Sequence, residues 1–143
     1  CRIMAWYCRG SVSRPVESGE PSLYARLGGA DALRPIIHDF VQAMVQDMMI
    51  GFFFRDVDPV QLERREFQFT ARFLGADIPY EGRSIRTAHA PHPIMGGQFD
   101  RRRKILEEAI DAHGVPADIK AAWLAHVDLL RPQVTREGAG QCD

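Results

Sequence analysis

Glycines and prolines divide the chain into short segments, and this punctuation limits the possible folds more than any other feature of the sequence. The breaks fall at Gly28-Gly29, Gly75–Gly82, Pro91–Pro93, Gly96-Gly97 and Gly114. Between the breaks, apolar residues recur every three to four positions, which is the period of an amphipathic helix. No segment alternates between apolar and polar residues as a half-buried strand does. The sequence therefore predicts an all-α domain built from about six short helices.

The expected helices cover residues 23–27, 33–48, 59–74, 84–89, 98–112 and 116–134. Ser22, Asp31 and Asp58 precede the first three and are suitable N-cap residues, and Pro59 follows Asp58 at a position that favours a helix start. The segment Gly51–Phe54 is expected to form a compact aromatic corner. The second helix has the clearest inner face, formed by Leu33, Ile36, Ile37, Phe40, Val41, Met44, Val45 and Met48.

A chain of 143 residues fits one domain with a single core. We expect the domain to cover residues 22–135. Residues 1–21 contain several glycines, serines and prolines and keep no regular period, so they are expected to form an irregular extension. Residues 136–143 are expected to form a loose tail.

Charge and cysteine content narrow the range of partners and compartments. A net charge of −1 gives no electrostatic reason to expect nucleic acid or a membrane surface as a partner. The basic run Arg101–Lys104 does not change this, because four consecutive helical residues point in different directions. No apolar run approaches the ~20 residues of a membrane span. Cys1, Cys8 and Cys142 lie near the chain ends, so the domain does not rely on disulfides, and we expect a cytoplasmic protein.

Several motifs occur in one order along the chain. They are Ser22–Gly29, Asp39-Phe40, Asp47, Phe53-Phe54, Leu74-Gly75, Pro79–Gly82, Ala88–Pro91, Ile94, Phe99-Asp100 and His113–Pro116. In this order and spacing they resemble the truncated haemoglobins, from about Ser22 to Val134. The resemblance implies a two-over-two helical sandwich that holds haem b and binds oxygen, nitric oxide or carbon monoxide.

The resemblance places His89 at the position of the proximal haem ligand. A neutral imidazole nitrogen is a strong ligand for haem iron and leaves the opposite face open to a small molecule. The sequence contains five histidines. His92 is the nearest rival, but the flanking prolines direct it towards solvent or a carbonyl cap. His38 lies on a polar helix face, His113 lies at a helix end, and His126 flanks the apolar face of the last helix.

The same resemblance suggests the walls of a haem pocket. Phe54 corresponds to an aromatic residue that packs on the haem. The other expected pocket residues are Leu62, Phe69, Phe73, Ile85, Ile94, Phe99 and Val127, for which ordinary core packing is the alternative. Arg65 lies where the family often places a basic residue towards a haem propionate, with a solvated helix position as the alternative.

The expected ligand side of the pocket departs from the family pattern. Val41 stands where many members have a tyrosine and cannot donate a hydrogen bond. Glu66 stands where many have glutamine and, when ionised, only accepts hydrogen bonds. Glu66 and Arg102 each interrupt an apolar helix face, so we predict that they pair across the pocket and that Arg102 donates to the ligand. The alternative is that both side chains reach past the haem edge into water.

Three classes of function follow. The first is a haem protein that binds a diatomic ligand for storage, scavenging or sensing. The second is a haem enzyme with nitric oxide dioxygenase or peroxidase-like activity, in which a reductase is a possible partner. The third is a globin-shaped module without haem, against which the presence of His89 and Phe54 argues. The fold itself does not choose among them.

Overall fold

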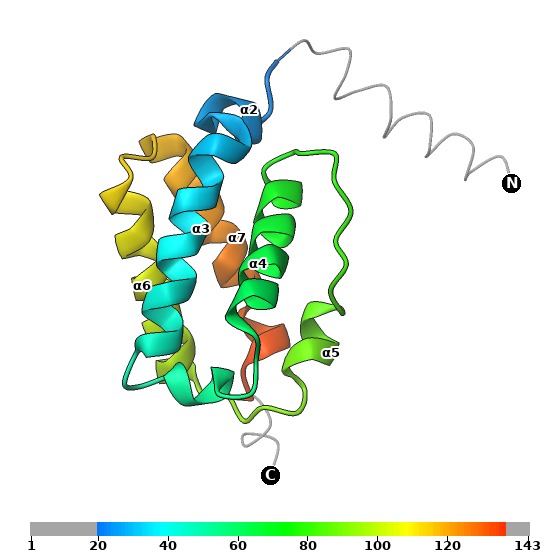
Figure 1. The fold of residues 1–143 in the computed structure, drawn as a ribbon, viewed down its shortest axis with the longest axis vertical. Helices are drawn as coiled ribbons and strands as arrows, with labels where there is room; N and C mark the ends of the chain where they lie inside the picture. Colours follow the sequence, from blue (N-terminus) through cyan, green and yellow to red (C-terminus); the bar gives the residue numbers. More distant parts are fainter. Residues whose placement is uncertain (1–19, 137–143) are drawn as a thin grey trace, which may run out of the picture.

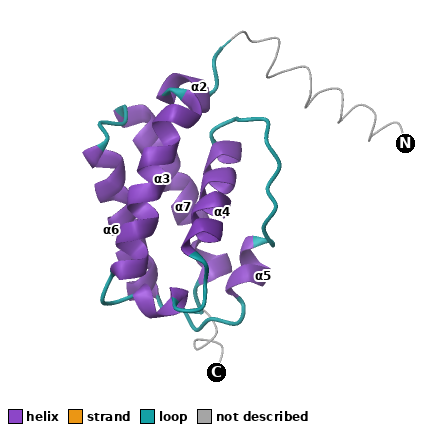
Figure 2. Cartoon of the chain, viewed as in Figure 1, coloured by secondary structure: helices purple, strands orange, loops and turns teal. Residues whose placement is uncertain are grey.

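The computed structural model describes residues 20–136. All regular elements in this range are helices, as the sequence predicts (Figures 1 and 2). They are α2 (Leu23–Leu27), α3 (Gly29–Gln46), the 3-10 helix η1 (Gly51–Phe54), α4 (Pro59–Phe73), α5 (Ile85–His89), α6 (Gly96–Ala112) and α7 (Ala117–Val134). The expectations for residues 1–19 and 137–143, the three cysteines among them, lie outside the described residues.

Helix α3 is the centre of the fold. It packs against α4 on one side and α6 on another, while α7 packs against α6 and α5 (Figure 1). The result is two helix pairs, α3–α4 and α6–α7. Six residues of α3 are at most 1% exposed and supply the middle of the core: Leu33, Ile36, Ile37, Phe40, Val41 and Met44. None of the described helices is both long and apolar enough to cross a membrane.

Three helices begin with a side-chain cap, and two of these caps, Ser22 and Asp58, were expected from the sequence. The Ser22 hydroxyl accepts a hydrogen bond from the Ala25 N–H at 3.1 Å, and the Asp58 carboxylate accepts one from the Val60 N–H at 3.1 Å. Ser84 caps α5 in the same way, by accepting a hydrogen bond from the Thr87 N–H at 3.2 Å. Each cap satisfies a backbone donor that the first turn of a helix leaves free.

Helix α3 is displaced towards the N-terminus relative to the prediction. It begins at Gly29, so Asp31 lies in the first turn and does not cap the helix. It ends at Gln46 because Asp47 is extended and its carboxylate accepts hydrogen bonds from the backbone N–H groups of the next turn. Met48 therefore lies beyond the helix and is fully exposed, where the sequence placed it in the core.

Helix α6 also starts earlier than expected, at Gly96. The Met95 N–H donates to the Gln98 side-chain oxygen at 2.9 Å, so Gln98 acts from inside the first turn to stabilise the helix start. A glycine pair usually separates two elements, because ordering glycine in a helix costs conformational entropy. Here the hydrogen bond of Gln98 helps to offset this cost at Gly96-Gly97.

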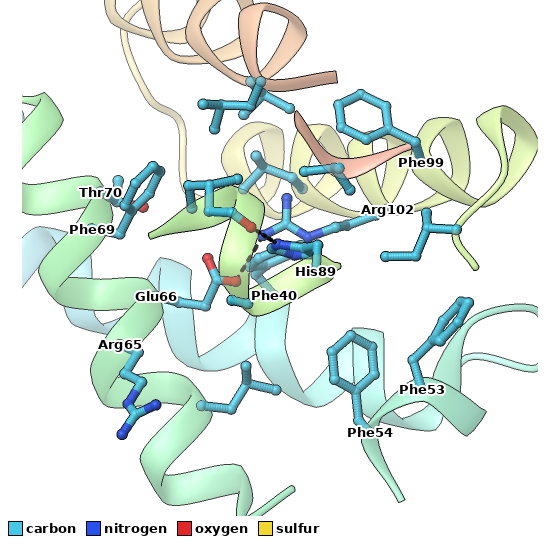
Figure 3. A pocket seen from close by; sticks show the side chains of 18 of the residues that line it. Phe40, Phe53, Phe54, Arg65, Glu66, Phe69, Thr70, His89, Phe99 and Arg102 are labelled. Atoms are coloured by element: carbon cyan, nitrogen blue, oxygen red, sulfur yellow. Dashed lines mark hydrogen bonds and ion pairs between the residues drawn. The ribbon is translucent and has the colours of Figure 1, made fainter. Parts of the chain in front are cut away.

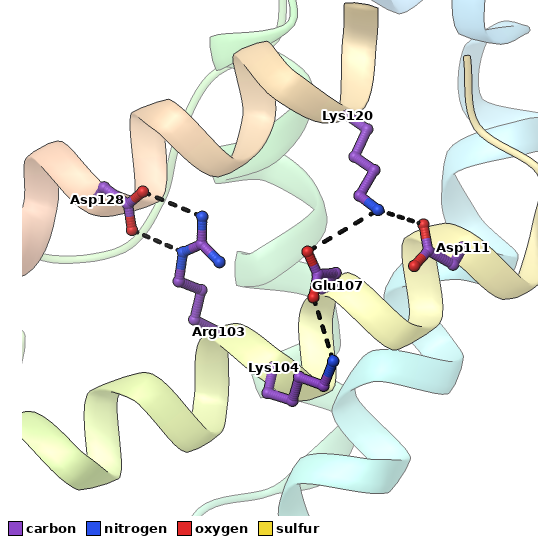
Figure 4. Close-up of polar contacts among 6 residues, drawn as sticks. All are labelled: Arg103, Lys104, Glu107, Asp111, Lys120 and Asp128. Carbon is purple, nitrogen blue, oxygen red and sulfur yellow. Dashed lines mark hydrogen bonds and ion pairs between the residues drawn. The ribbon is translucent and has the colours of Figure 1, made fainter. Parts of the chain in front are cut away.

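The four consecutive basic residues of α6 point to four different neighbours, which confirms that they form no basic stripe. Their partners are Asp47 for Arg101, Glu66 for Arg102, Asp128 for Arg103 and Glu107 for Lys104. The Arg103 pair is bidentate, at 2.7 and 3.1 Å, and joins α6 to α7 (Figure 4). Lys120 of α7 adds contacts to Asp111 and Glu107 of α6. Of the four basic residues 101–104, the three arginines thus connect α6 to other parts of the fold, whereas Lys104 pairs within α6.

Candidate functional site

A cavity of about 290 Å³ lies among η1, α4, α5, α6 and α7. Its walls are mainly apolar, as the labelled aromatic side chains in Figure 3 illustrate, and they contain every residue that the sequence analysis assigned to the pocket walls. These residues are Phe54, Leu62, Phe69, Phe73, Ile85, Ile94, Phe99 and Val127. Arg65 is exposed at the edge of the same cavity.

Helix α4 presents two faces with different roles. Phe67 and Ala71 are buried and do not line the cavity, and α4 packs against α3. Leu62 and Phe73 are only partly buried because they face the cavity, which protein atoms do not fill. Apolar side chains that line an open cavity lose contacts that a packed core provides. The residues of α4 that the resemblance assigned to the pocket walls therefore line a site shaped for an apolar group.

His89 is the last residue of α5 and lines the cavity. Its Nδ1 lies 2.7 Å from the Ile85 carbonyl oxygen, so Nδ1 must carry the proton and donate it. Burial is the main cause that lowers the pKa of His89, partly offset by this hydrogen bond. The neutral ring then has its lone pair on Nε2, which has no hydrogen-bond partner among residues 20–136. This is the tautomer that a metal-binding imidazole needs.

Glu66 and Arg102 form the ion pair that the sequence predicted. Arg102 Nη2 donates to Glu66 Oε1 at 2.7 Å, across the space between α6 and α4 (Figure 3). The two side chains are only 26% and 19% exposed, and both line the cavity that His89 lines. The guanidinium carbon also lies 4.9 Å from the centre of the Phe40 ring. These contacts hold Arg102 at the cavity wall and away from bulk water.

Val41 does not line the cavity, although the sequence analysis placed it in the distal pocket. It is fully buried in the core, and the neighbouring Phe40 reaches the cavity instead. Consecutive helical residues point about 100° apart, so a one-residue difference decides which of them faces the site. Val41 offers no polar group to a ligand in either position.

Two further histidines line the cavity, where the sequence analysis expected neither. His92 lies edge-on to Phe53, with ring centres 6.0 Å apart. His126 stacks on Phe73 at 4.0 Å between ring centres, and burial lowers its pKa. The other two histidines lie elsewhere, His38 bonded to Glu63 and His113 bonded to Asp39.

Tyr80 and Arg83 also line the cavity and were missed as site residues. A Cβ atom at Gly82 would lie only 2.2 Å from the Tyr80 hydroxyl oxygen, so the ring folds back over this glycine. The Tyr-x-Gly spacing was thus a signal for a tyrosine turned inward. Burial is the main cause that raises the pKa of Tyr80, and the charge of Glu66 acts in the same direction. Arg83, exposed like Arg65, adds a second cation at the cavity edge.

Comparison with known proteins gives consistent matches. A family model described as bacterial-like globin matches residues 22–136. The chain is 28% identical over 120 residues to the group 1 truncated hemoglobin GlbN of Mycolicibacterium paratuberculosis, covering 84% of this chain and 88% of that protein. It is 32% identical over 104 residues to the group 1 truncated hemoglobin GlbN of a Synechocystis species, covering 70% of this chain and 84% of that protein.

A similar fold occurs among solved structures. The hemoglobin from Chloroflexus aurantiacus superposes with a TM-score of 0.75 at 21% identity, covering 82% of this chain and 100% of the other. At this level of identity the match concerns the arrangement of helices, which is that of the two helix pairs described above.

Proposed function

Because the chain belongs to the bacterial-like globin family, as a group 1 truncated haemoglobin, we propose that it binds haem b through His89 and takes a diatomic ligand in the pocket beside Arg102. Haem, when bound, supplies an iron with one axial position open to oxygen, nitric oxide or carbon monoxide. The residues of the cavity divide into three groups that support this proposal.

The strongest support for haem binding is the protonation of the His89 ring and its position in the cavity wall. Its Nδ1–H donates to the Ile85 carbonyl, which leaves the lone pair on Nε2, and the residue lines an apolar cavity. The hydrogen bond from Nδ1 fixes the ring orientation and raises the basicity of Nε2. The prolines after α5 end the helix at this residue, so the ring is held at the end of a short, capped helix.

The remaining walls fit haem in shape and charge. Phe54, Leu62 and Phe73 offer apolar surface that other side chains leave uncovered. The exposed guanidinium groups of Arg65 and Arg83 lie at the edge, where they are suited to the two carboxylates of haem b. An apolar interior with cations at its rim matches a flat apolar group that carries anionic substituents on one side.

Arg102 is the strongest hydrogen-bond donor beside the ligand position that we propose. Glu66 holds its guanidinium in the cavity, and Arg102 can donate to the outer atom of a diatomic ligand. Glu66 stands where many members of the family have glutamine, and Arg102 supplies the donor that Val41, at the position of the tyrosine, lacks. Oxygen storage, scavenging and sensing are all compatible with this arrangement.

The same pair favours a second candidate function, a peroxidase-like haem enzyme. A carboxylate can accept a proton from a peroxide while a neighbouring guanidinium stabilises the negative charge that develops. Peroxide turnover far above that of free haemin would support this candidate. Reversible oxygen binding without rapid oxidation of the iron would support the first.

An absorption spectrum tests the haem proposal directly. We expect the purified protein to show a Soret band that shifts when the protein is reduced and given carbon monoxide. His89→Ala should lose the bound haem or the spectrum of an imidazole-ligated haem. His92→Ala is the matched control because His92 lines the same cavity, and it should keep the wild-type spectrum. A wild-type spectrum in His89→Ala would contradict the assignment.

A further inference from the structure

Arg102 uses little of its hydrogen-bonding capacity within the protein. A guanidinium has five N–H donors, and Arg102 makes one hydrogen bond, from Nη2 to Glu66 Oε1. No other hydrogen bond to Arg102 is found within residues 20–136. The Phe40 ring, whose centre lies 4.9 Å from the guanidinium carbon, is not a conventional hydrogen-bond acceptor. Donor groups therefore remain for an acceptor that enters the cavity.

Glu66 is the only acidic residue among those that line the cavity in the described part of the chain. The other titratable or charged lining groups are Arg65, Tyr80, Arg83, His89, His92, His126 and Arg102. The positive charge of Arg102 is thus balanced inside the cavity by a single carboxylate. Both partners are largely buried, so water screens neither charge well.

Building on the proposed function, we propose that Arg102 makes the pocket a site for small monoanions, and that Glu66 competes with them for the same guanidinium. A bound anion would accept hydrogen bonds from the donors that Arg102 leaves free, beside the carboxylate. The pocket then holds two negative charges against one guanidinium, so the carboxylate opposes anion binding as much as it orients Arg102. A neutral ligand meets no such competition.

The proposal predicts opposite effects for the two members of one ion pair. Arg102→Met keeps the length of the side chain and removes its charge and donors, so it should weaken binding of a monoanion by about tenfold or more. Glu66→Gln keeps the shape and removes the competing charge, so it should strengthen binding by about tenfold. Two side chains that merely extend into water would give neither effect.

Azide is a suitable probe, titrated into the haem-loaded, oxidised full-length protein while the Soret band is followed. Arg103→Met is the matched control, because Arg103 adjoins Arg102 in sequence, pairs with Asp128 and does not line the cavity (Figure 4). Its azide affinity should equal that of the wild type. The infrared antisymmetric stretch of bound azide should shift in Arg102→Met and stay unchanged in the control, since it responds to hydrogen bonds at the anion.

The outcomes separate this inference from the proposed function. A protein with no Soret band would overturn both. A protein that binds haem and carbon monoxide normally, while azide affinity is the same in wild type, Glu66→Gln and Arg102→Met, would overturn the inference alone. If Arg102→Met does not take up haem, Arg102→Lys keeps the charge and loses the planar donor edge. Its azide affinity should then fall below that of wild type, and equal affinity would contradict the proposal.

Discussion

Gln68 and Glu81 join α4 to the long segment before α5 by two reciprocal hydrogen bonds. The Glu81 N–H donates to Gln68 Oε1, and Gln68 Nε2 donates to Glu81 Oε2, each at 3.1 Å. Gln68 is only 9% exposed, so water could not readily replace these hydrogen bonds if they were lost. The segment that these bonds hold carries Tyr80, which lines the cavity. A side chain on the far face of α4 thus fixes one wall of the site.

Replacing Gln68 with methionine should therefore destabilise the fold. The variant keeps the volume and removes both hydrogen bonds, which should lower the free energy of unfolding by about 1–3 kcal/mol. Urea unfolding followed by circular dichroism measures this difference. Gln46→Met, at the exposed end of α3, is the control and should leave the stability close to that of the wild type. Equal stability of the two variants would show that the Gln68 bonds contribute nothing.

Gly75 should tolerate alanine much less well than Gly114. Both have positive φ angles, +107° and +64°, which L-residues rarely adopt. A Cβ atom at Gly75 would also lie 2.7 Å from the Cβ of Ser22, whereas one at Gly114 would meet no atom within 4 Å. We expect Gly114→Ala to cost about 1 kcal/mol and Gly75→Ala about 2–4 kcal/mol of unfolding free energy. Thermal and urea unfolding of both variants would test this order, and a reversed order would contradict the role of Ser22.

Asp47 should make the stability depend on acid pH. Its carboxylate accepts two hydrogen bonds from Arg101, at 2.9 and 2.7 Å, and these are the main cause that lowers its pKa below the usual 3.8. The folded state therefore holds Asp47 ionised at pH values where the unfolded state takes up a proton. This stabilising contribution is complete above about pH 4 and is lost as the pH falls through the lowered pKa.

Asp47→Asn should accordingly be less stable than the wild type at pH 7, and the difference should shrink as the pH falls below 4. Urea unfolding of both proteins between pH 7 and pH 2.5 measures it. Asp56→Asn, on an exposed turn, should show no such change in difference. If the difference in unfolding free energy between Asp47→Asn and the wild type stayed constant over this pH range, the ionisation of Asp47 would not be its cause.

The sequence predicted most of the helices because their ends are determined locally. Ser22, Asp58 and Ser84 cap helices in the structure through contacts within three residues. The errors at the ends of α3 and the start of α6 have a similar origin. Asp47 and Gln98 act on backbone groups close by, and either residue could equally have been an ordinary helical position.

The sequence predicted site residues where a charged residue interrupts an apolar helix face. It was less informative where only side-chain packing determines which residue faces the cavity. Glu66 and Arg102 stood out because each interrupts an apolar face, and long-range pairing is the usual remedy for a buried charge. Val41 and Phe40 both lie on the apolar face of α3, so nothing in the sequence showed which would reach the cavity. His126 likewise looks like a flanking residue until the stacking with Phe73 places it at the wall.

Arg136 should restrain the segment that follows His89. Its guanidinium donates to the Ala90 carbonyl, and its backbone N–H donates to the Ile94 carbonyl at 3.0 Å, although these residues are more than 40 positions apart in sequence. Helix α5 has only five residues, so contacts from Arg136, just beyond α7, replace the stability that a longer helix would supply itself.

Arg136→Met removes the side-chain bond and keeps the backbone one. We expect hydrogen exchange of the Ala90, His92 and Ile94 amides to become about three- to tenfold faster, because a hydrogen bond from a charged but exposed donor is lost. Loss of haem to an acceptor protein should accelerate in the same range, since His89 lies directly before this segment. Gln133→Met, exposed near the end of α7, is the control. If exchange at these amides is unchanged while the global stability falls, Arg136 stabilises the fold as a whole and does not specifically restrain residues 90–94.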